Sequence, residues 1–181
     1  MSFGSRAKGS KAEIEVAKKL EAWWGQVEPG CKFVRTPLSG GWGKPEHRAG
    51  FQASGDLMTT AAQWPWAVEV KRRETFSWKT LLAGRASPVW GWWRQAQVAA
   101  EEMSKEPLLL FRKNREPWHV MVTLTHCLAY GGWMSSAWLT IDANPAHTGG
   151  RVPVLVPGSE FFESSPRMWL SRPVTVSANQ T

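Results

Sequence analysis

The stretch AVEVKRR at residues 67–73 alternates apolar and charged side chains. Successive side chains of a β-strand point to opposite faces, so Val68 and Val70 share one face of a predicted strand. Glu69 and Lys71 share the other face. The valine face predicts packing against a hydrophobic core, whereas the charged face requires surroundings that accept an acid beside a base. A surface ion pair on an amphipathic strand is the alternative interpretation.

The chain has 181 residues, 43% of them hydrophobic, which is enough for one sizeable domain. Strand and helix patterns alternate along it and predict an α/β fold with a central mixed β-sheet flanked by helices. The core is expected within residues 1–125. Residues 126–181 are expected to form an extension of the core sheet instead of a second domain, with a loose tail over 164–181.

Hydrophobic periodicity and capping residues predict the individual elements. Residues 1–9 are expected to be a flexible basic arm, and the first helix to run from the N-cap Ser10 to Gly25. Strands 55–60 and 66–72 are expected to pair antiparallel. The other predicted elements are strands over 31–36, 107–113 and 118–124, helices over 75–84 and 88–105, and a long loop over 37–50.

Positive charge is concentrated in one part of the chain. The formal net charge is +7, and residues 71–115 carry 10 basic and 4 acidic side chains. Such an excess indicates a polyanionic partner, either nucleic acid or an anionic membrane surface. No apolar run reaches the roughly 18 residues of a membrane span, no signal peptide is visible, and the two cysteines lack metal-ligand spacing. A soluble cytoplasmic protein is therefore expected.

The thirteen tryptophans have two interpretations. The first is a tryptophan-rich hydrophobic core. The second places Trp90, Trp92 and Trp93 near a DNA groove, where aromatic faces stack on unpaired bases.

Asp56, at the start of the preceding predicted strand, would lie beside Glu69 if the two strands pair. Neighbouring carboxylates repel each other, and a hard divalent cation such as Mg²⁺ relieves that repulsion. The Val70 carbonyl is a further candidate oxygen ligand. Lys71 would then orient the attacking water or stabilise charge on the phosphorane.

Glu13 is an unusual residue on the predicted first helix, because it falls on the apolar stripe with Val16, Leu20 and Trp24. A carboxylate there is costly unless it is paired. The alternative is a capping-box side chain, since Glu13 follows Ser10 by the required spacing.

These motifs together resemble the PD-(D/E)xK nuclease superfamily: Glu13 in GSKAEIEVAKKL, the loop RTPLSGGWG, Asp56 in SGD, and Glu69 with Lys71 in EVK. Within the superfamily the chain is most similar to Holliday junction resolvases of the archaeal type and their phage-borne relatives, over residues 9–113. The resemblance implies a restriction-endonuclease-like core and a role in DNA recombination. It also implies Mg²⁺ dependence, with Mn²⁺ as a substitute, and action in the host cytoplasm for a phage-encoded enzyme. A four-way junction has two-fold symmetry and needs two nicks, so a homodimer is expected.

The resemblance also implies roles for individual residues. Asp56 and Glu69 would coordinate the metal, and Glu13 would complete the acidic site. Lys71 would be the catalytic lysine, and Ser39 would lie near the phosphate.

The superfamily's helix glutamine corresponds to Gln95 or Gln97, and we prefer Gln95; an ordinary solvated helix position is the alternative for either. The chain departs from the family pattern in having Gly55-Asp56 in place of Pro-Asp. Five basic residues are candidate phosphate contacts that position DNA without reading its sequence, with a solvated basic surface as the alternative. They are Arg35, Lys44, Arg48, Arg72 and Arg73.

The sequence therefore predicts a metal-dependent DNA endonuclease, with Holliday junctions as the preferred substrate. Two alternatives remain: a nicking or repair endonuclease that acts on other DNA structures, and a DNA-binding protein that retains the scaffold without activity.

Overall fold

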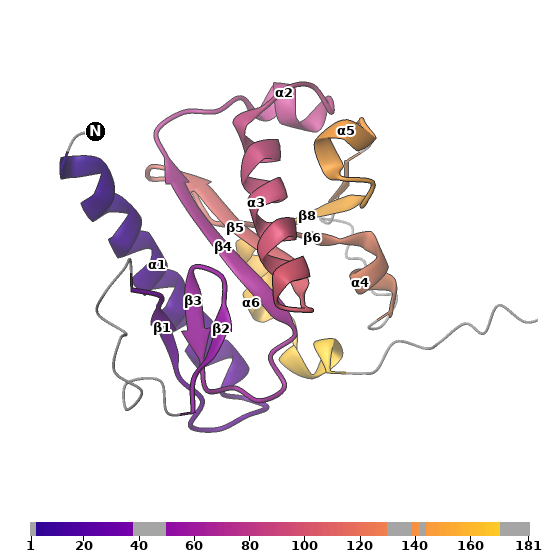
Figure 1. The fold of residues 1–181 in the computed structure, drawn as a ribbon. Coiled ribbons are helices and arrows are strands. Elements are labelled where there is room, and N and C mark those ends of the chain that lie inside the picture. Colours follow the sequence, from indigo (N-terminus) through magenta and orange to yellow (C-terminus); the bar gives the residue numbers. More distant parts are fainter. Residues whose placement is uncertain (1–2, 38–49, 130–138, 142–143, 171–181) are drawn as a thin grey trace, which may run out of the picture.

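The computed structural model describes residues 3–37, 50–129, 139–141 and 144–170 (Figure 1). They form a five-stranded sheet of order β4-β5-β6-β8-β7 and a three-stranded sheet of order β1-β3-β2. In the larger sheet β4 and β5 pair parallel and the other neighbours pair antiparallel. The predicted α/β fold with a mixed central sheet is confirmed.

The predicted helices and strands up to β6 appear in the predicted order with changes at their ends, and β2 is an additional strand. The strands are β1 (Phe33–Arg35), β2 (Gln52–Ser54), β3 (Leu57–Thr59), β4 (Trp66–Arg73), β5 (Glu106–Lys113), β6 (His119–Thr123), β7 (Leu139–Thr140) and β8 (Pro153–Pro157). The helices are α1 (Phe3–Trp24), α2 (Trp78–Leu82), α3 (Pro88–Glu102), α4 (Leu124–Ala129), α5 (Pro145–Thr148), α6 (Gly158–Glu163) and the 3₁₀ helix η2 (Pro166–Trp169).

Helix α1 begins at Phe3 instead of Ser10, so the prediction of a flexible arm over residues 1–9 is wrong for residues 3–9. Helix-favouring residues precede Gly9 and Ser10, and propagating an existing helix through two weak positions costs less than starting a new one. Because Ser10 lies inside the helix, it cannot cap it, and the capping-box interpretation of Glu13 is wrong. No helix of the described residues is both long enough and apolar enough to cross a bilayer.

The predicted hairpin between strands 55–60 and 66–72 is also wrong. Strand β3 pairs antiparallel with β2 on one side and with β1 on the other. The small sheet meets β4 through one parallel bridge, between Gly55 and Val68. Gly55-Asp56 is therefore a turn between two short strands, and β2 was missed because its three residues carry no clear alternation.

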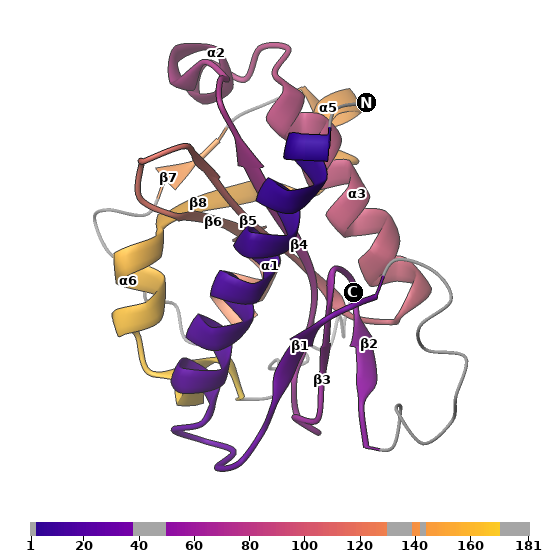
Figure 2. The ribbon, with the colours of Figure 1, turned by 90° about the vertical axis from the view of Figure 1, so that its left-hand side faces the viewer.

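The alternation in β4 is confirmed by the packing of the two sheet faces. Val68 and Val70 belong to a core cluster that includes Leu20 of α1. Glu69 and Lys71 are in register with Leu109 and Phe111 of β5, which pack in a second cluster with α3. Helices α1 and α6 thus cover one face of the large sheet and α3 covers the other (Figures 1 and 2).

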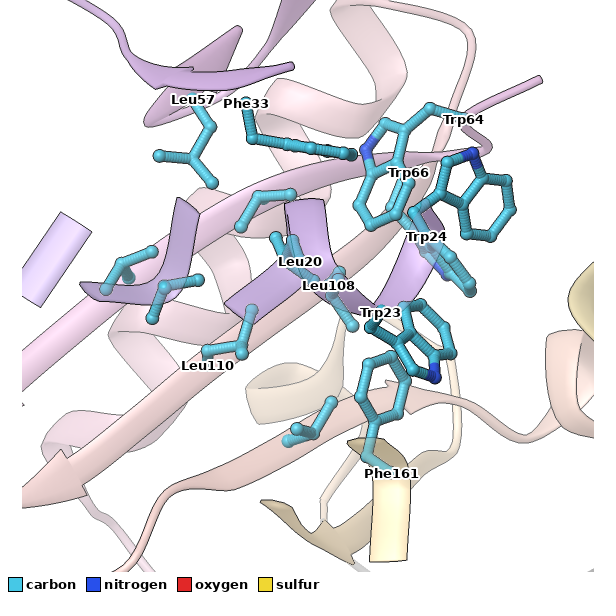
Figure 3. Packing of buried hydrophobic residues seen from close by; sticks show 14 of the residues in the cluster. Leu20, Trp23, Trp24, Phe33, Leu57, Trp64, Trp66, Leu108, Leu110 and Phe161 are labelled. Carbon is cyan, nitrogen blue, oxygen red and sulfur yellow. The ribbon is translucent and has the colours of Figure 1, made fainter. Parts of the chain in front are cut away.

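Tryptophans fill much of the core, as the first interpretation predicts. The rings of Trp64 and Trp66 have centroids 4.9 Å apart, and Trp23 lies 4.7 Å from Phe161 of α6 (Figure 3). The alternative DNA-stacking role is wrong for the tryptophans of α3, which pack in the cluster between α3 and the sheet. Their exposed fractions are 4% for Trp90, 9% for Trp92 and 0% for Trp93.

The C-terminal part of the chain adds strands to the large sheet: β8 pairs with β6, and β7 pairs with β8. The prediction of a loose tail is wrong for residues 164–169, because Trp169 of η2 is buried in the main core cluster. Its ring stacks on His126 of α4 at a centroid distance of 5.5 Å. A large aromatic side chain buries enough apolar area to order a short segment that has little regular structure.

Replacing Trp169 with Ala should lower the free energy of unfolding by about 3–5 kcal/mol, because the change leaves a large cavity in the core. Urea unfolding of the full chain measures this. Arg167→Ala, in the same turn and exposed, is the control and should be close to neutral. Equal stability of the two variants would contradict a core role for η2.

Candidate active site

The turn between β2 and β3 holds Asp56 against the open edge of β4. The Asp56 amide donates to the Val68 carbonyl at 2.7 Å, and the Val70 amide donates to Asp56 Oδ2 at 2.9 Å. The N–H and C=O of a strand residue point to the same side, so the Val70 carbonyl also lies on this edge. Asp56 and the Val70 carbonyl therefore lie on the same edge of β4, which Asp56 reaches through a turn and not through the predicted hairpin.

Gly55 makes this approach possible. Its φ is +74°, and a Cβ built on it would lie 2.3 Å from the Val68 carbonyl oxygen. Thr36 holds the turn from the other side, since its hydroxyl donates to the Gly55 carbonyl at 2.9 Å and its amide to the Asp56 carbonyl at 2.9 Å. Proline cannot adopt this φ, which explains why Gly-Asp replaces Pro-Asp here. The sequence pattern did not predict the role of Thr36. The presence of Gly instead of Pro before Asp56 was the feature that could have indicated a close backbone approach at Gly55.

Glu69 is a buried carboxylate of the site with a perturbed pKa. It is 8% exposed and forms an ion pair with Lys71. Burial raises the pKa of Glu69 above its usual value, and the negative charges of Asp56 and Glu13 raise it further, while the hydrogen bond from Lys71 lowers it. Three carboxylates from α1, the β2–β3 turn and β4 therefore share one electrostatic neighbourhood.

Glu13 is paired, as a carboxylate on an apolar stripe must be. Its partner is Arg35 of β1, whose Nε donates to Glu13 Oε2. Arg35 was predicted as a phosphate contact, and the structure holds it at the acidic site. A contact between Arg35 and DNA remains a prediction.

The described part of the chain contains no group of three or more His, Cys, Asp or Glu side chains arranged to hold a metal ion. Each carboxylate instead binds a donor within the protein: Arg35 for Glu13, the Val70 amide for Asp56 and Lys71 for Glu69. The residues nevertheless fit a divalent cation. Their donors are hard oxygens, and the carboxylates disfavour one another's charge, which a bound cation would relieve.

The two candidate glutamines of α3 differ in their surroundings. Gln97 is buried and its Nε2 donates to the Thr148 carbonyl of α5 at 2.7 Å, so it anchors the C-terminal extension and is not a site residue. Gln95 is exposed on α3, and its catalytic role remains a prediction. Three other predicted residues, Ser39, Lys44 and Arg48, lie outside the described residues.

The two arginines at the end of β4 lie just beyond Lys71. Arg72 donates from Nε to Asn114 Oδ1 at 2.8 Å, and Arg73 is exposed. Both remain candidate DNA contacts.

The mixed sheet with its flanking helices is consistent with a PDDEXK nuclease core. The sequence model of the family described as "Phage putative PDDEXK endonuclease" matches residues 4–147, and the chain belongs to this family. The description names an endonuclease of phages and no junction substrate. The match also extends past residue 125, so the first part of the C-terminal extension lies within the family's span. No curated protein and no solved structure matches the chain significantly.

Replacing Gly55 with Ala should lower the free energy of unfolding by about 2 kcal/mol or more, because the change adds left-handed strain and a clash with the Val68 carbonyl. Gly30→Ala is a matched control, since Gly30 has a φ of +82° and open space around its Cβ position. Urea unfolding should show the larger loss at Gly55. Equal losses would contradict a required close approach to β4.

Replacing Glu69 with Gln should stabilise the protein near neutral pH. The folded-state pKa of Glu69 lies above its usual 4.5, so the folded protein holds this proton more tightly than the unfolded chain does. Stability from Glu69 is therefore present at low pH and is lost as the pH rises through the folded pKa.

Urea unfolding of the wild type and Glu69→Gln across the acidic and neutral range measures this effect. The advantage of the variant should be small below the usual glutamate pKa and should grow as the pH rises. Glu102→Gln, at an exposed position of α3, controls for the change in net charge. An advantage of Glu69→Gln that does not vary with pH would contradict the pKa shift.

Proposed function

We propose that this chain is a divalent-metal-dependent DNA endonuclease that hydrolyses phosphodiester bonds, with four-way Holliday junctions as its preferred substrate. The observation that supports the chemistry best is the state of Glu69: buried, bonded to Lys71, and raised in pKa by Asp56 and Glu13. A buried carboxylate with a perturbed pKa and a specific charged partner is typical of catalytic sites.

Asp56, Glu69, Glu13 and the Val70 carbonyl would hold the cation, which we propose is Mg²⁺, with Mn²⁺ as a substitute. When bound, this ion supplies Lewis-acid stabilisation of the phosphate and lowers the pKa of water.

Lys71 has its own part in the reaction. Its ammonium is held beside the acidic site by Glu69. There it would orient the attacking water and donate to a phosphate oxygen on which negative charge develops. The water oxygen would bond to phosphorus and lose a proton to solvent, the bond from phosphorus to the leaving oxygen would break, and the leaving oxygen would take up a proton from solvent. We propose Ser39 and Gln95 as further residues near the phosphate.

The proposed DNA contacts are Arg35, Lys44, Arg48, Arg72 and Arg73. Arg72 and Arg73 continue the strand that carries Glu69 and Lys71. A DNA backbone that reaches Lys71 would therefore pass them.

The junction preference is supported by the similarity of the GSKAEIEVAKKL, SGD and EVK motifs to Holliday junction resolvases. A homodimer follows from it, because two symmetric nicks require two active sites. A nicking or repair endonuclease on other DNA structures would use the same site. A DNA-binding protein without activity is the remaining alternative.

Cleavage of labelled four-way junction and plain duplex, with Mg²⁺ or with EDTA, tests the function and the site together. We expect metal-dependent cutting of the junction in preference to the duplex. Lys71→Ala should lower the cleavage rate by about 100-fold or more, through loss of charge stabilisation, while DNA binding persists. Lys18→Ala, at an exposed position of α1, is the matched control.

Each part of the proposal has its own contrary result. Binding of DNA without cleavage of either substrate would overturn the proposal that the chain is an enzyme. Equal cleavage of duplex and junction would overturn the junction preference. Normal cutting by Lys71→Ala would overturn the site.

A further inference from the structure

The ends of β4 and β5 place basic side chains next to one another. Arg72 is in register with Arg112, and Arg73 is in register with Lys113. Neighbouring strands lie only about 4.8 Å apart, and like charges at facing positions destabilise a sheet. Such an arrangement needs negative charge from elsewhere.

Strand β5 obtains that charge from within the protein. Arg112 forms an ion pair with Glu15 of α1 at 2.7 Å, and Lys113 forms one with Glu116 at 3.5 Å. Both basic residues also lie over aromatic rings, with Arg112 4.4 Å from the centroid of Trp118.

The arginines of β4 differ from this arrangement in the part of the chain that the structure describes. Within the described ranges no carboxylate lies at ion-pair distance from Arg72 or Arg73. Among the described side chains, Arg72 donates to the neutral Oδ1 of Asn114. Alternation places Arg73 on the face of Glu69 and Lys71, about 6.6 Å further along the strand. The side chains on this face of β4 therefore run from Glu69 in the acidic site, through Lys71, to the positive charge of Arg73.

The turn between β5 and β6 adds a further cation at a conformational cost. Arg115 has a φ of +67°, in the left-handed region that favours glycine or asparagine, and its side chain is exposed. The Asn114 amide donates to the Arg73 carbonyl at 2.9 Å, which fastens this turn to the end of β4 (Figure 1). A turn shaped for stability alone would carry glycine at this position.

Helix α2 fixes the turn in place. Trp78 donates from Nε1 to Glu116 Oε2 at 3.2 Å, and its ring lies 4.4 Å from that of His119. Lys113 Nζ lies 5.2 Å from the ring of Phe76. These contacts hold the turn and the Lys113 side chain in a fixed position. Less conformational entropy is therefore lost when a partner binds.

We propose that the β5–β6 turn, residues 113–116, binds the phosphate backbone of DNA beside the cleaved bond, with Arg115 as its principal contact. This inference rests on the proposed function, because the turn extends the row of Glu69, Lys71 and Arg73. Its chemistry is that of a polyanion contact that positions DNA without reading bases. The left-handed backbone of Arg115 places a positive charge next to the end of β4, where the DNA backbone would pass beyond Arg73.

Fluorescence anisotropy of labelled duplex and four-way junction, in EDTA and over a range of salt concentrations, tests the proposal. Arg115→Gly should raise Kd several-fold and reduce the slope of log K against log salt by about 0.9, as expected for one lost phosphate contact. Its Tm should stay equal or rise, because glycine accepts the left-handed backbone. Arg115→Lys keeps the charge and should retain most of the affinity.

Arg167→Gln is the control, since it removes one exposed arginine from η2, at the yellow C-terminal end in Figure 1 and away from the turn. Arg115→Gly with the affinity and salt slope of this control would overturn the proposal. Equal losses in Arg115→Gly and Arg115→Lys would also overturn it, because charge would then not be the cause. Absence of DNA binding by the wild type would instead overturn the proposed function itself.

Discussion

The site depends on the seating of the Gly55-Asp56 turn against the open edge of β4. Two backbone-directed hydrogen bonds, from the Asp56 amide to Val68 and from the Val70 amide to the Asp56 carboxylate, join the small sheet to the large one. This is possible because residue 55 has no side chain where the chains approach most closely. The contact places an acid from one sheet beside an acid and a lysine from the other.

Electrostatics then decides how the gathered charges coexist. Glu13, Asp56 and Glu69 each accept a hydrogen bond from a donor of the protein, so the folded chain tolerates three acids in one region. These hydrogen bonds do not fully offset the cost of the negative charges, because burial and the neighbouring carboxylates raise the pKa of Glu69. A site that remains short of positive charge is chemically suited to a divalent cation.

The C-terminal extension belongs to the same structure as the site. Phe161 and Trp169 pack in the cluster that holds α1 against the sheet, and Gln97 of α3 bonds the Thr148 carbonyl of α5. Residues that looked peripheral in the sequence therefore support the helices on either side of β4. One aromatic residue, Trp169, in a segment without helix or strand periodicity was not enough to predict this packing from the sequence.

Much of the fold and part of the site could be predicted from local pattern. Alternation in AVEVKRR correctly separates Val68 and Val70 from Glu69 and Lys71, because strand geometry allows no other arrangement. The apolar stripe of α1 likewise identifies Glu13 as a carboxylate that needs a partner. Tertiary structure alone decided that the partner is Arg35, that Asp56 reaches β4 through a turn, and that Gln97 is structural. These contacts join residues distant in sequence, and their geometry depends on how whole elements pack.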